Sequence, residues 1–552
     1  MSKRPRIFSW AQFNLARLLQ LAEALHGRPC HCDQDQRPMS GAMNWAIKIQ
    51  FDDDERMEWI FRSPLPRVCP DDIAGALLAS EVATIQCIAE RTTVPVPTIF
   101  AFCAHSDNDI GVPYILQSKA TGTSLIDYSI REATGAGPGL TDDQRATIMG
   151  QLGAFARQMA QVRFPKIGSL VRDSAQSDYS VGPCLAPAFV WGERHLLDDL
   201  DRGPFDSPRG YFDTLAEALS RHAQELGMDY HALLAPLPRD DDYMDREARR
   251  FAGRRWNHFV SVRDKIDHSR NRFAYCMAAN ILRETVVPYL CCADGGSTDA
   301  SGYPLIHPDL NVGNIFVDDV MNVTCIIDWS SATTAPLLEL LAAPRLWGYM
   351  EVVPRLFDTY RDAVHAALPT QHRKTNVEKN AHEGRKDDEE EVFWARASTA
   401  LVFQRLTRFC SSHDYKDFVT CIQRAKAAAD KAAAATINTD VVLNLLEEEA
   451  RRDANKTLLA ELQDDDPPPG TADVQDRVGF FDGDRRAETN NLAVARKLTV
   501  MWQMNPRFVA DARLWTWLLK ALGDIKASSD DIQDAKSEDG NAGGRGRTQT
   551  TN

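Results

Sequence analysis

The sequence contains no apolar stretch of the roughly 18 residues that a membrane-spanning helix needs, so we expect no membrane partner. It contains no long lysine or arginine run, and its formal net charge is -15. An acidic chain lacks the basic face that binds nucleic acid, so we expect no nucleic-acid partner. The twelve cysteines follow no repeating spacing, which argues against a disulfide framework. A secretory signal is also missing, and the expected location is cytoplasmic.

The length of 552 residues, with 44% hydrophobic and 26% charged residues, is typical of a globular protein of roughly two to four domain-sized units. No acidic residue precedes Glu23, which resembles a mitochondrial transit peptide and leaves a mitochondrial location as an alternative. Leu18, Ala22 and Leu25, however, recur at helical spacing. Gly27 follows them as a helix-stop signal, so a structural first helix is the favoured interpretation.

Alternating apolar residues predict a β-hairpin over residues 45–62. In its second strand, Met57, Trp59 and Phe61 are expected to point inward, and Arg62 lies on the opposite face. A helix follows over 72–91. Two further strands are predicted within 92–102 and 111–122, so the N-terminal part is expected to be a small sheet with one helix.

The rest of the chain shows mainly helical patterns. The segment 140–300 is expected to be largely helical and to include a long apolar helix at 272–290. The polar stretch 366–391 is predicted to be a disordered or exposed insert. The remaining expectations are helices through 393–462, a last helix at 513–523, and an unstructured tail from about 526.

The segment 305–329, LIHPDLNVGNIFVDDVMNVTCIIDW, places acids and amides between two short β-branched strands. If the strands pair as a hairpin centred near Met321, Asn314 lies opposite Asp328. One amide oxygen and one carboxylate suit a hard cation such as Mg²⁺, which takes its other ligands from water and phosphate. Asp309 lies on the loop that enters the first strand, where it can meet a substrate hydroxyl.

The order His307, Asp309, Asn314 and then Asp328 has the spacing of the protein-kinase catalytic loop and its metal aspartate. Together with the stretches MEWIFRSP, LASEVATIQCIAERTTVPVPTIFAF, GVPYILQSKATGTSL and VRFPKIGSL, it resembles the aminoglycoside phosphotransferase (APH) family over roughly 40–350. By this resemblance, Asp309 is the catalytic base, Asn314 and Asp328 bind the metal, and His307 is a packing residue of the loop.

The resemblance implies an α+β, bilobal, protein-kinase-like fold with ATP between a small β-rich lobe and a larger, mainly helical lobe. The implied parts are 1–118 for the N-terminal helix and small lobe, 119–365 for the catalytic lobe, 366–391 for the insert, 392–525 for a C-terminal helical part, and 526–552 for the tail. The implied cofactors are ATP and Mg²⁺.

Glu81 lies on the apolar face of its helix, where an ionised carboxylate needs a partner. Arg62 is the favoured partner, and the two resemble the kinase Lys–Glu pair whose cation also reaches the α- and β-phosphates. Arginine in place of lysine departs from the kinase pattern, although its planar fork can bind both carboxylate and phosphate. Lys48 on the preceding strand is the rival, but the order of strand and helix favours Arg62.

A Gly-rich phosphate loop is missing, and Ser40, Gly41 and Asn44 are the candidates for covering the phosphates. Backbone groups from Gln117 to Lys119 are expected to meet adenine at the hinge between the lobes. Side chains there carry little information.

The favoured function is ATP-dependent transfer of the γ-phosphate to a hydroxyl of a small molecule, and the acidic composition favours a cationic acceptor. One alternative is a non-catalytic pseudokinase or nucleotide-binding scaffold, against which the complete set of acidic and amide residues argues. A second alternative is a protein kinase. It is disfavoured because D-F-G and A-P-E motifs are missing and the segment before Pro336 is too short for an activation loop. The sequence does not determine the oligomeric state.

Overall fold

The computed structural model describes residues 12–41, 43–53, 57–65, 70–172, 178–228, 231, 233, 269–292, 302–347, 352–366, 383–409, 414–429 and 439–464. The chain forms two compact units. Unit 1 comprises Met1–Leu219, Leu282–Arg408 and Arg424–Asp430, and unit 2 comprises Ser220–Ile281, Phe409–Gln423 and Lys431–Asn552. Unit 1 therefore holds both the predicted small lobe and most of the predicted large lobe. The finer boundaries proposed from the sequence stay predictions.

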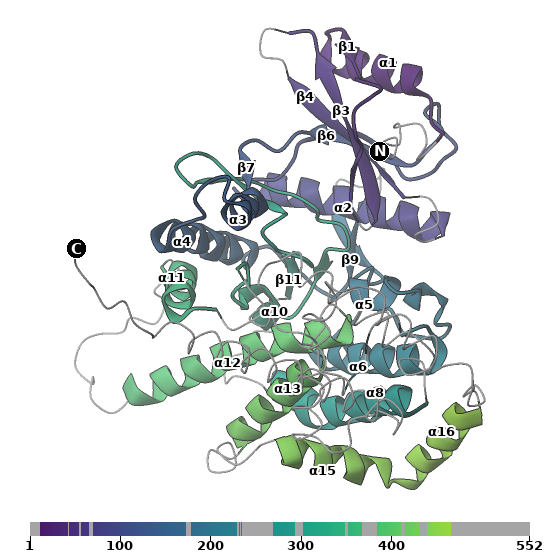
Figure 1. Cartoon of the computed structure of the whole chain (residues 1–552), viewed down its shortest axis with the longest axis vertical. Helices are drawn as coiled ribbons and strands as arrows, with labels where there is room; N and C mark the ends of the chain where they lie inside the picture. The colour runs from purple at the N-terminus through teal and green to yellow at the C-terminus, as the bar shows by residue number, and fades with distance from the viewer. Residues whose placement is uncertain are drawn as a thin grey trace, which may run out of the picture. The chain divides into compact units, whose positions relative to one another are not determined.

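An antiparallel sheet forms the N-terminal part of unit 1 (Figure 1). Its strands are β1 (Cys30–His31), β2 (Met39–Ser40), β3 (Asn44–Phe51), β4 (Glu58–Pro64), β5 (Ile99–Cys103) and β6 (Tyr114–Ser118). The order is β1-β3-β4-β6-β5, with β2 on β3. The predicted hairpin is confirmed as β3–β4, in which Ile47 pairs with Phe61. Met57 was expected to point inward but is 36% exposed, because it precedes β4.

Two helices complete this part. Helix α1 (Leu15–His26) begins at Asn14, whose side chain accepts from the Arg17 N–H, and ends at Gly27 with φ 79°. Glycine adopts such a left-handed conformation without steric cost, so the predicted helix and its stop are confirmed. Leu18 and Ala22 are buried as predicted, whereas Leu25 is exposed.

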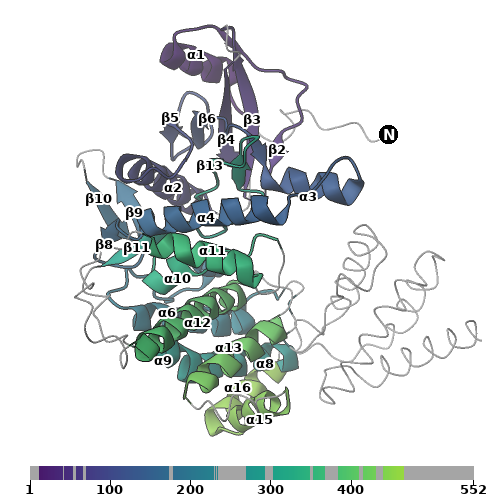
Figure 2. The same ribbon diagram turned by 90° about the vertical axis from the view of Figure 1, so that its left-hand side faces the viewer.

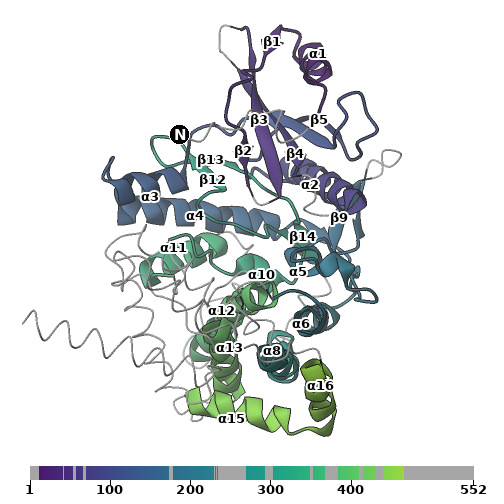
Figure 3. The ribbon, with the colours of Figure 1, turned by 45° about the vertical axis from the view of Figure 1, so that its right-hand side comes forward.

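Helix α2 (Asp71–Arg91) confirms the second predicted helix. Most of its residues between Ala74 and Ile88 are buried. By length and composition it is apolar enough to cross a membrane, contrary to the expectation that no such stretch exists. However, 67% of the apolar window is buried inside the protein, as expected for the core helix of a globular fold. Figure 3 shows α2 running along the sheet beside β4.

The larger part of unit 1 is mainly helical. It includes the two predicted strands β12 and β13, and further short strands that the sequence did not predict. Its helices are α3 (Leu125–Thr134), α4 (Asp142–Met159), α5 (Pro187–Val190), α9 (Val287–Leu290), α10 (Leu337–Leu341), α11 (Pro354–His365), α12 (Glu383–Thr407) and the first part of α6 (Pro208–Glu225). Its strands are β7 (Thr123–Ser124), β8 (Arg163–Phe164), β9 (Ser169–Arg172), β10 (Tyr179–Gly182), β11 (Tyr303–Ile306), β12 (Ile315–Val317), β13 (Val323–Ile326) and β14 (Thr333–Thr334). The predicted α+β class is confirmed.

The core beneath the sheet gathers residues from α2, α4, α11 and the β11–β13 region, with Leu152, Tyr360 and Trp329 among its buried members. Helices α4 and α11 lie side by side (Figure 2). Their backbones come so close that a Cβ on Gly153 would lie 2.4 Å from the Tyr360 carbonyl oxygen. This contact allows only glycine at position 153 unless the helices move apart.

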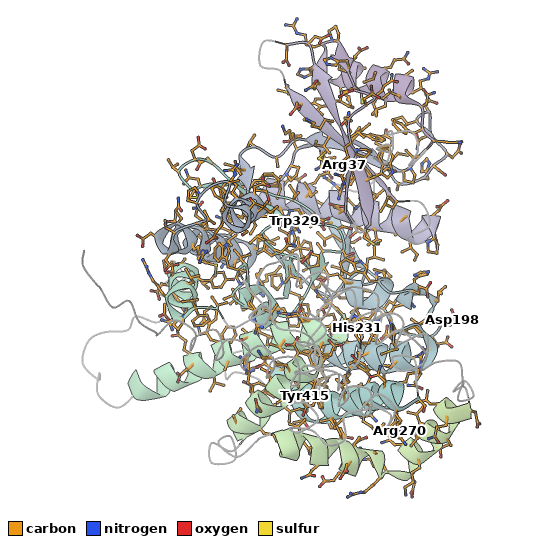
Figure 4. All side chains as sticks on the ribbon, in the orientation of Figure 1. Arg37, Asp198, His231, Arg270, Trp329 and Tyr415 are labelled. Atoms are coloured by element: carbon orange, nitrogen blue, oxygen red, sulfur yellow. The ribbon has the colours of Figure 1, made fainter. Side chains whose placement is uncertain are left out.

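Unit 2 includes α8 (Ser269–Ile281), α15 (Thr439–Ala450), α16 (Asp453–Asp464) and most of α13 (Asp414–Ala429). Helix α8 packs against α15 and α16. Three buried polar residues meet there: the Asp414 carboxylate accepts from the Tyr275 hydroxyl and lies 2.9 Å from the His231 ring. Figure 4 labels His231.

Two predicted segments differ in detail from the observed elements. The helix expected at 272–290 is α8, followed by a π-helical turn η4 (Leu282–Val286) and then α9. Pro288 has no N–H to donate, which removes one helical hydrogen bond at this point. Of the expected insert 366–391, residues 367–382 lie outside the described residues, and the last part is helical because α12 begins at Glu383. The predictions for 513–523 and for the tail from 526 lie outside the described residues.

Candidate active site

Arg62, Glu81 and Asp328 meet in unit 1 although they are far apart in the sequence. Arg62 lies near the end of β4, and its Nη2 is 2.6 Å from Glu81 Oε1 on α2. Its Nη1 is 3.6 Å from Asp328 Oδ1, just after β13. One guanidinium thus joins the sheet, the helix and the loop after the β12–β13 hairpin. The pair with Glu81 was predicted from the sequence, whereas the contact with Asp328 was not.

The Arg62–Glu81 pair is shielded from water, with the Arg62 side chain 11% exposed and that of Glu81 2% exposed. Burial raises the pKa of Glu81, while the Arg62 guanidinium and the backbone N–H of Trp329 oppose that rise. A buried carboxylate with a charged partner at this distance is strongly destabilised when the partner is removed. The pair is therefore a fixed feature of the site.

Lys48, the rival of Arg62, does not approach Glu81. Its ammonium lies 3.3 Å from Glu58 Oε1. Lys119 also pairs with Glu58, and this hydrogen bond, despite some opposition from burial, holds the pKa of Glu58 down to about 2. Lys48 and Lys119 therefore share one carboxylate near the start of β4. The preference for Arg62 over Lys48 as the partner of Glu81 is confirmed, whereas contact of Arg62 with phosphate stays a prediction.

His307 holds the loop that leads to Asp309. Its Nε2 lies 3.0 Å from the Ile327 carbonyl oxygen, and its Nδ1 accepts from the Asp309 N–H at 3.1 Å. These two bonds require a neutral ring with the proton on Nε2. Burial lowers the pKa of His307, which agrees with a neutral ring, and the ring packs edge-on against Trp329. The loop-packing role expected of His307 fits this geometry; Trp329 is labelled in Figure 4.

The loop after His307 is closed by its own side chains. Asn314 Nδ2 donates to the Asp309 carbonyl oxygen at 2.9 Å, and Asn311 Nδ2 donates to the same oxygen at 3.2 Å. The Asn311 amide oxygen accepts from the Gly313 N–H at 2.7 Å. The backbone of Asp309 is thus fixed on both sides, while its side chain is exposed. A fixed backbone with an accessible carboxylate is what a catalytic base requires.

The pairing of Asn314 with Asp328 was predicted one residue out of register. In the β12–β13 hairpin, Ile315 pairs with Ile326, so the Asn314 carbonyl accepts from the Ile327 N–H at 2.9 Å. The register shifts between Phe316 and Val317, which a symmetric hairpin does not anticipate. Asp328 follows the pair with φ 64°, a left-handed conformation that turns the chain out of the strand.

The residues fit a hard divalent cation. Asn314 uses its amide nitrogen within the loop, which leaves its amide oxygen as the atom for a metal. The Asp328 carboxylate is 46% exposed and so accessible. In the described part of the chain, no group of three or more His, Cys, Asp and Glu side chains is placed to hold a metal. An amide oxygen beside a carboxylate suits Mg²⁺, which keeps waters and takes phosphate oxygens as further ligands.

The candidates for covering phosphate lie close to this site. Ser40 ends β2, and the Gly41 N–H donates to the Asn44 carbonyl at 3.0 Å across the turn into β3. Asn44, Glu81 and Ser330 line one small cavity, so the β2–β3 turn reaches the Arg62–Glu81 pair. Contact of this turn with phosphate stays a prediction.

The hinge candidates are placed on or just after β6. Gln117 is a buried residue of this strand and pairs with Ile60 of β4, whereas the Lys119 side chain is engaged by Glu58. Contact of their backbone with adenine also stays a prediction. Gly122, which follows, has φ +88°, and a Cβ there would lie 2.3 Å from the Val317 carbonyl oxygen. Only glycine fits this passage from β6 to β7.

Sequence reasoning missed one residue that touches the loop. Arg408, directly after α12, donates from Nη1 to the Pro308 carbonyl oxygen at 3.1 Å. It lies 100 positions from Pro308 in the chain, and no local pattern signals the contact. Only the packing of α12 against α10 brings this part of the chain toward the loop.

Comparison with known proteins agrees with the motif. Two curated relatives are subtelomeric hrmA-associated cluster proteins from two strains of Aspergillus fumigatus. Each is 29% identical over 300 residues, which cover 50% of this chain and 54% of the relative. The chain thus matches about half the length of these curated relatives.

Two solved structures are similar at a greater distance. The gentamicin complex of APH(2")-IIa is 8% identical with a TM-score of 0.36, covering 75% of this chain and 97% of that chain. A thermostable mutant of the aminoglycoside phosphotransferase APH(4)-Ia, bound to AMP-PNP and hygromycin B, is 12% identical with a TM-score of 0.35, covering 75% and 99%. Likenesses this distant add no argument of their own.

Residues 47–374 match the phosphotransferase enzyme family, APH. This match spans the sheet from within β3 onward, α2, the loop of His307 to Asn314, and Asp328, and it covers more than half of the 552 residues. The chain therefore belongs to the APH phosphotransferase enzyme family.

Proposed function

We propose that this protein is an ATP-dependent kinase that transfers the γ-phosphate to a hydroxyl group of a small molecule. The observation that carries the proposal is the double contact of Arg62, at 2.6 Å to Glu81 and 3.6 Å to Asp328. It places a cation between the small sheet and the residue expected to bind metal. Such a cation neutralises the charge of bound phosphates without further rearrangement.

Asp309 takes the proton in this reaction. The acceptor oxygen attacks the γ-phosphorus, the bond from that phosphorus to the bridging oxygen of ADP breaks, and the hydroxyl proton passes to the Asp309 carboxylate. The hydrogen bonds of Asn314 and His307 hold the Asp309 backbone while this happens. Mg²⁺, when bound, neutralises phosphate charge, and Asn314 and Asp328 are the residues that would hold it.

The segment after Asp328 favours a small acceptor over a protein substrate. Strand β14 pairs with β11 through Thr333 and Thr334, and α10 begins at Leu337. Nine positions therefore separate Asp328 from the next helix, and paired backbone occupies part of them. No long activation segment fits between Asp328 and α10, whereas protein kinases use one to control their activity.

Turnover of Mg·ATP by the purified full chain tests the proposal. ADP release is followed against a panel of amino sugars, amino alcohols, neutral sugars and hydroxy amino acids, since the acidic composition favours a cationic acceptor. Wild type is compared with Asp309→Asn, in which the general base is lost. We expect turnover with at least one acceptor and a fall of about 10²- to 10⁴-fold in the variant.

Asp319→Asn is the matched control, because Asp319 is an exposed carboxylate in the turn of the same β12–β13 hairpin. It should leave turnover unchanged. Equal turnover by wild type and Asp309→Asn would refute the role of Asp309. Binding of Mg·ATP without turnover of any acceptor would favour a nucleotide-binding scaffold, and no binding at all would exclude the proposed kinase.

A further inference from the structure

Arg408 is a buried arginine that touches the catalytic loop from outside the family match. The match ends at residue 374, and Arg408 directly follows α12. The Arg408 side chain is 8% exposed, and its Nη1 donates to the carbonyl of Pro308, the residue before Asp309. A guanidinium buried against this peptide holds the Pro308–Asp309 bond at a fixed place.

Arg408 lies among other buried polar groups. Glu339 on α10 and Tyr211 on α6 are buried beside it. Burial raises the pKa of Glu339 to about 8, while Arg408 opposes that rise. Glu339 therefore keeps its proton at neutral pH and is uncharged beside Arg408. Because the guanidinium is itself buried, its contact with Pro308 is part of the core.

The end of α12 is itself held in place. Arg194, which is buried, donates from Nη1 to the carbonyls of Thr407 at 2.6 Å and Ala188 at 2.9 Å. Thr407 is the last residue of α12 and the neighbour of Arg408. A capped helix end gives the Arg408 side chain a rigid base.

A second arginine of α12 makes the same kind of contact elsewhere. Arg396 is also buried and donates from Nη2 to the carbonyls of Leu290 at 3.0 Å and Cys292 at 2.6 Å. These carbonyls lie at and after the end of α9, away in sequence from the catalytic loop. Helix α12 and the residue directly after it thus present two buried guanidinium groups to backbone carbonyls of two different segments.

We propose that Arg408 is a positioning residue for Asp309, supplied by the segment beyond the family match. It acts through the Pro308 carbonyl. The effect on turnover rests on the proposed function, because it needs Asp309 to be the base. The effect on the order of the loop does not rest on it.

The first measurement is amide hydrogen exchange in the peptide that covers 305–314, in wild type and in Arg408→Met. The N–H groups of Asp309, Gly313 and Asn314 are bonded within the loop, so their exchange reports its order. We expect exchange there to rise about tenfold in the variant, while the β3–β4 hairpin keeps its protection.

The second measurement is the kinetics with the acceptor found in the panel. We expect kcat to fall about tenfold or more in Arg408→Met, with KM for Mg·ATP changed less than twofold, because the nucleotide contacts are untouched. Arg408→Lys keeps the charge but lacks the fork, and it should show an intermediate effect on both measurements. Should Arg408→Met fail to fold, Arg408→Lys decides the question with the same measurements.

Arg396→Met is the matched control, since it removes another buried arginine, from the helix that directly precedes Arg408. It should lower Tm but leave loop exchange and kcat close to wild type. Unchanged loop exchange in a folded Arg408 variant would overturn the proposal, and so would an equal change in Arg396→Met. If wild type turns over no acceptor, the proposed kinase fails, but the exchange measurement still decides the role of Arg408.

Discussion

Arg62 makes its two ion pairs through two different nitrogens of one guanidinium. Glu81 and Asp328 approach it from different elements, so the planar fork spans a gap between α2 and the loop after β13. A lysine at this position has a single ammonium group and cannot bridge both carboxylates in the same way. This explains why arginine can replace the lysine that the kinase pattern leads one to expect.

Substitution of Arg62 by lysine tests this reasoning. We expect Arg62→Lys to lose one charged hydrogen bond, worth about 2 kcal/mol, and therefore to lower kcat/KM for Mg·ATP by roughly thirtyfold. Steady-state kinetics measures the change. Lys48→Met on the neighbouring strand is the control. It should change the activation free energy that corresponds to kcat/KM by less than about 0.5 kcal/mol. A larger loss in Lys48→Met than in Arg62→Lys would return the role to Lys48.

The distance between helices α4 and α11 depends on a glycine, Gly153, whose missing Cβ lets the two backbones approach. At Gly153 an added Cβ would lie 2.4 Å from the Tyr360 carbonyl oxygen, whereas at Gly150 it would lie 3.5 Å from the Thr359 side chain. The first distance requires the helices to separate, and the second is an ordinary contact. Gly153 is therefore needed for the close approach of the two helices, whereas Gly150 is not.

We predict opposite effects on stability from alanine at these two positions. Gly153→Ala should lower the free energy of unfolding by about 1–3 kcal/mol, because overpacking outweighs the gain in helix propensity. Gly150→Ala should raise it by about 0.5–1 kcal/mol, because only the propensity changes. Urea unfolding followed by circular dichroism measures both. The packing argument fails if Gly153→Ala is as stable as Gly150→Ala.

Protonation of Glu339 on α10 makes the stability of the folded protein depend on pH. Its pKa of about 8 in the folded protein lies above the ordinary value of 4.5, chiefly because of burial. The folded state thus keeps a proton that the unfolded state releases between these values. The stabilisation that this retained proton provides is fully present below pH 4.5 and is lost as the pH rises toward 8.

Glu339→Gln should flatten this part of the pH profile. Thermal unfolding between pH 5 and 8.5 should show a smaller decline with rising pH in Glu339→Gln than in wild type. Glu58→Gln is the contrasting variant, because the pKa of Glu58 is lowered to about 2, first by the hydrogen bond from Lys119. Its stabilisation is present above pH 4.5 and lost as the pH falls toward 2, so Glu58→Gln should lower Tm by a constant amount between pH 5 and 8.5 and leave the slope of the profile there unchanged. A parallel shift of the whole profile in Glu339→Gln would contradict the linkage.

At the scale of the whole molecule, ligand binding couples the catalytic site to the stability of the fold. A ligand that binds only the folded state stabilises it by about 2.7 kcal/mol at a hundred times its Kd. Residues of the site come from the sheet, from α2, and from the loops on both sides of the β12–β13 hairpin. All of them belong to unit 1, so a bound nucleotide should oppose the unfolding of that unit.

We expect Mg·ATP to raise Tm by roughly 2–5 °C when it is present well above its Kd. ATP with a chelator should raise Tm less, because Asn314 and Asp328 then have no cation to hold. Differential scanning fluorimetry measures both conditions. In Asp328→Asn the difference between them should disappear, whereas Asp319→Asn should keep it. A metal-dependent shift that survives in Asp328→Asn would remove Asp328 from the metal site.

Local spacing in the sequence determined much of this protein. Alternation predicted the β3–β4 hairpin, and the 3.6-residue period predicted α2 with Glu81 on its buried face. The order of His307, Asp309 and Asn314 predicted the catalytic loop, because the hydrogen bonds within it join residues only two to five positions apart. The preference for Arg62 over Lys48 followed from the order of the elements and is confirmed.

Tertiary structure decided the features that depend on packing between distant segments. The β12–β13 turn and the register shift after Phe316 together place Asn314 opposite Ile327 and not Asp328, which strand periodicity cannot foresee. Lys119 was expected at the hinge only for its backbone, and its side chain proved to bind Glu58. Arg408 reaches Pro308 across 100 positions. Spacing along the chain encodes periodic and near contacts, but such long-range pairs depend on helices and strands having first assembled.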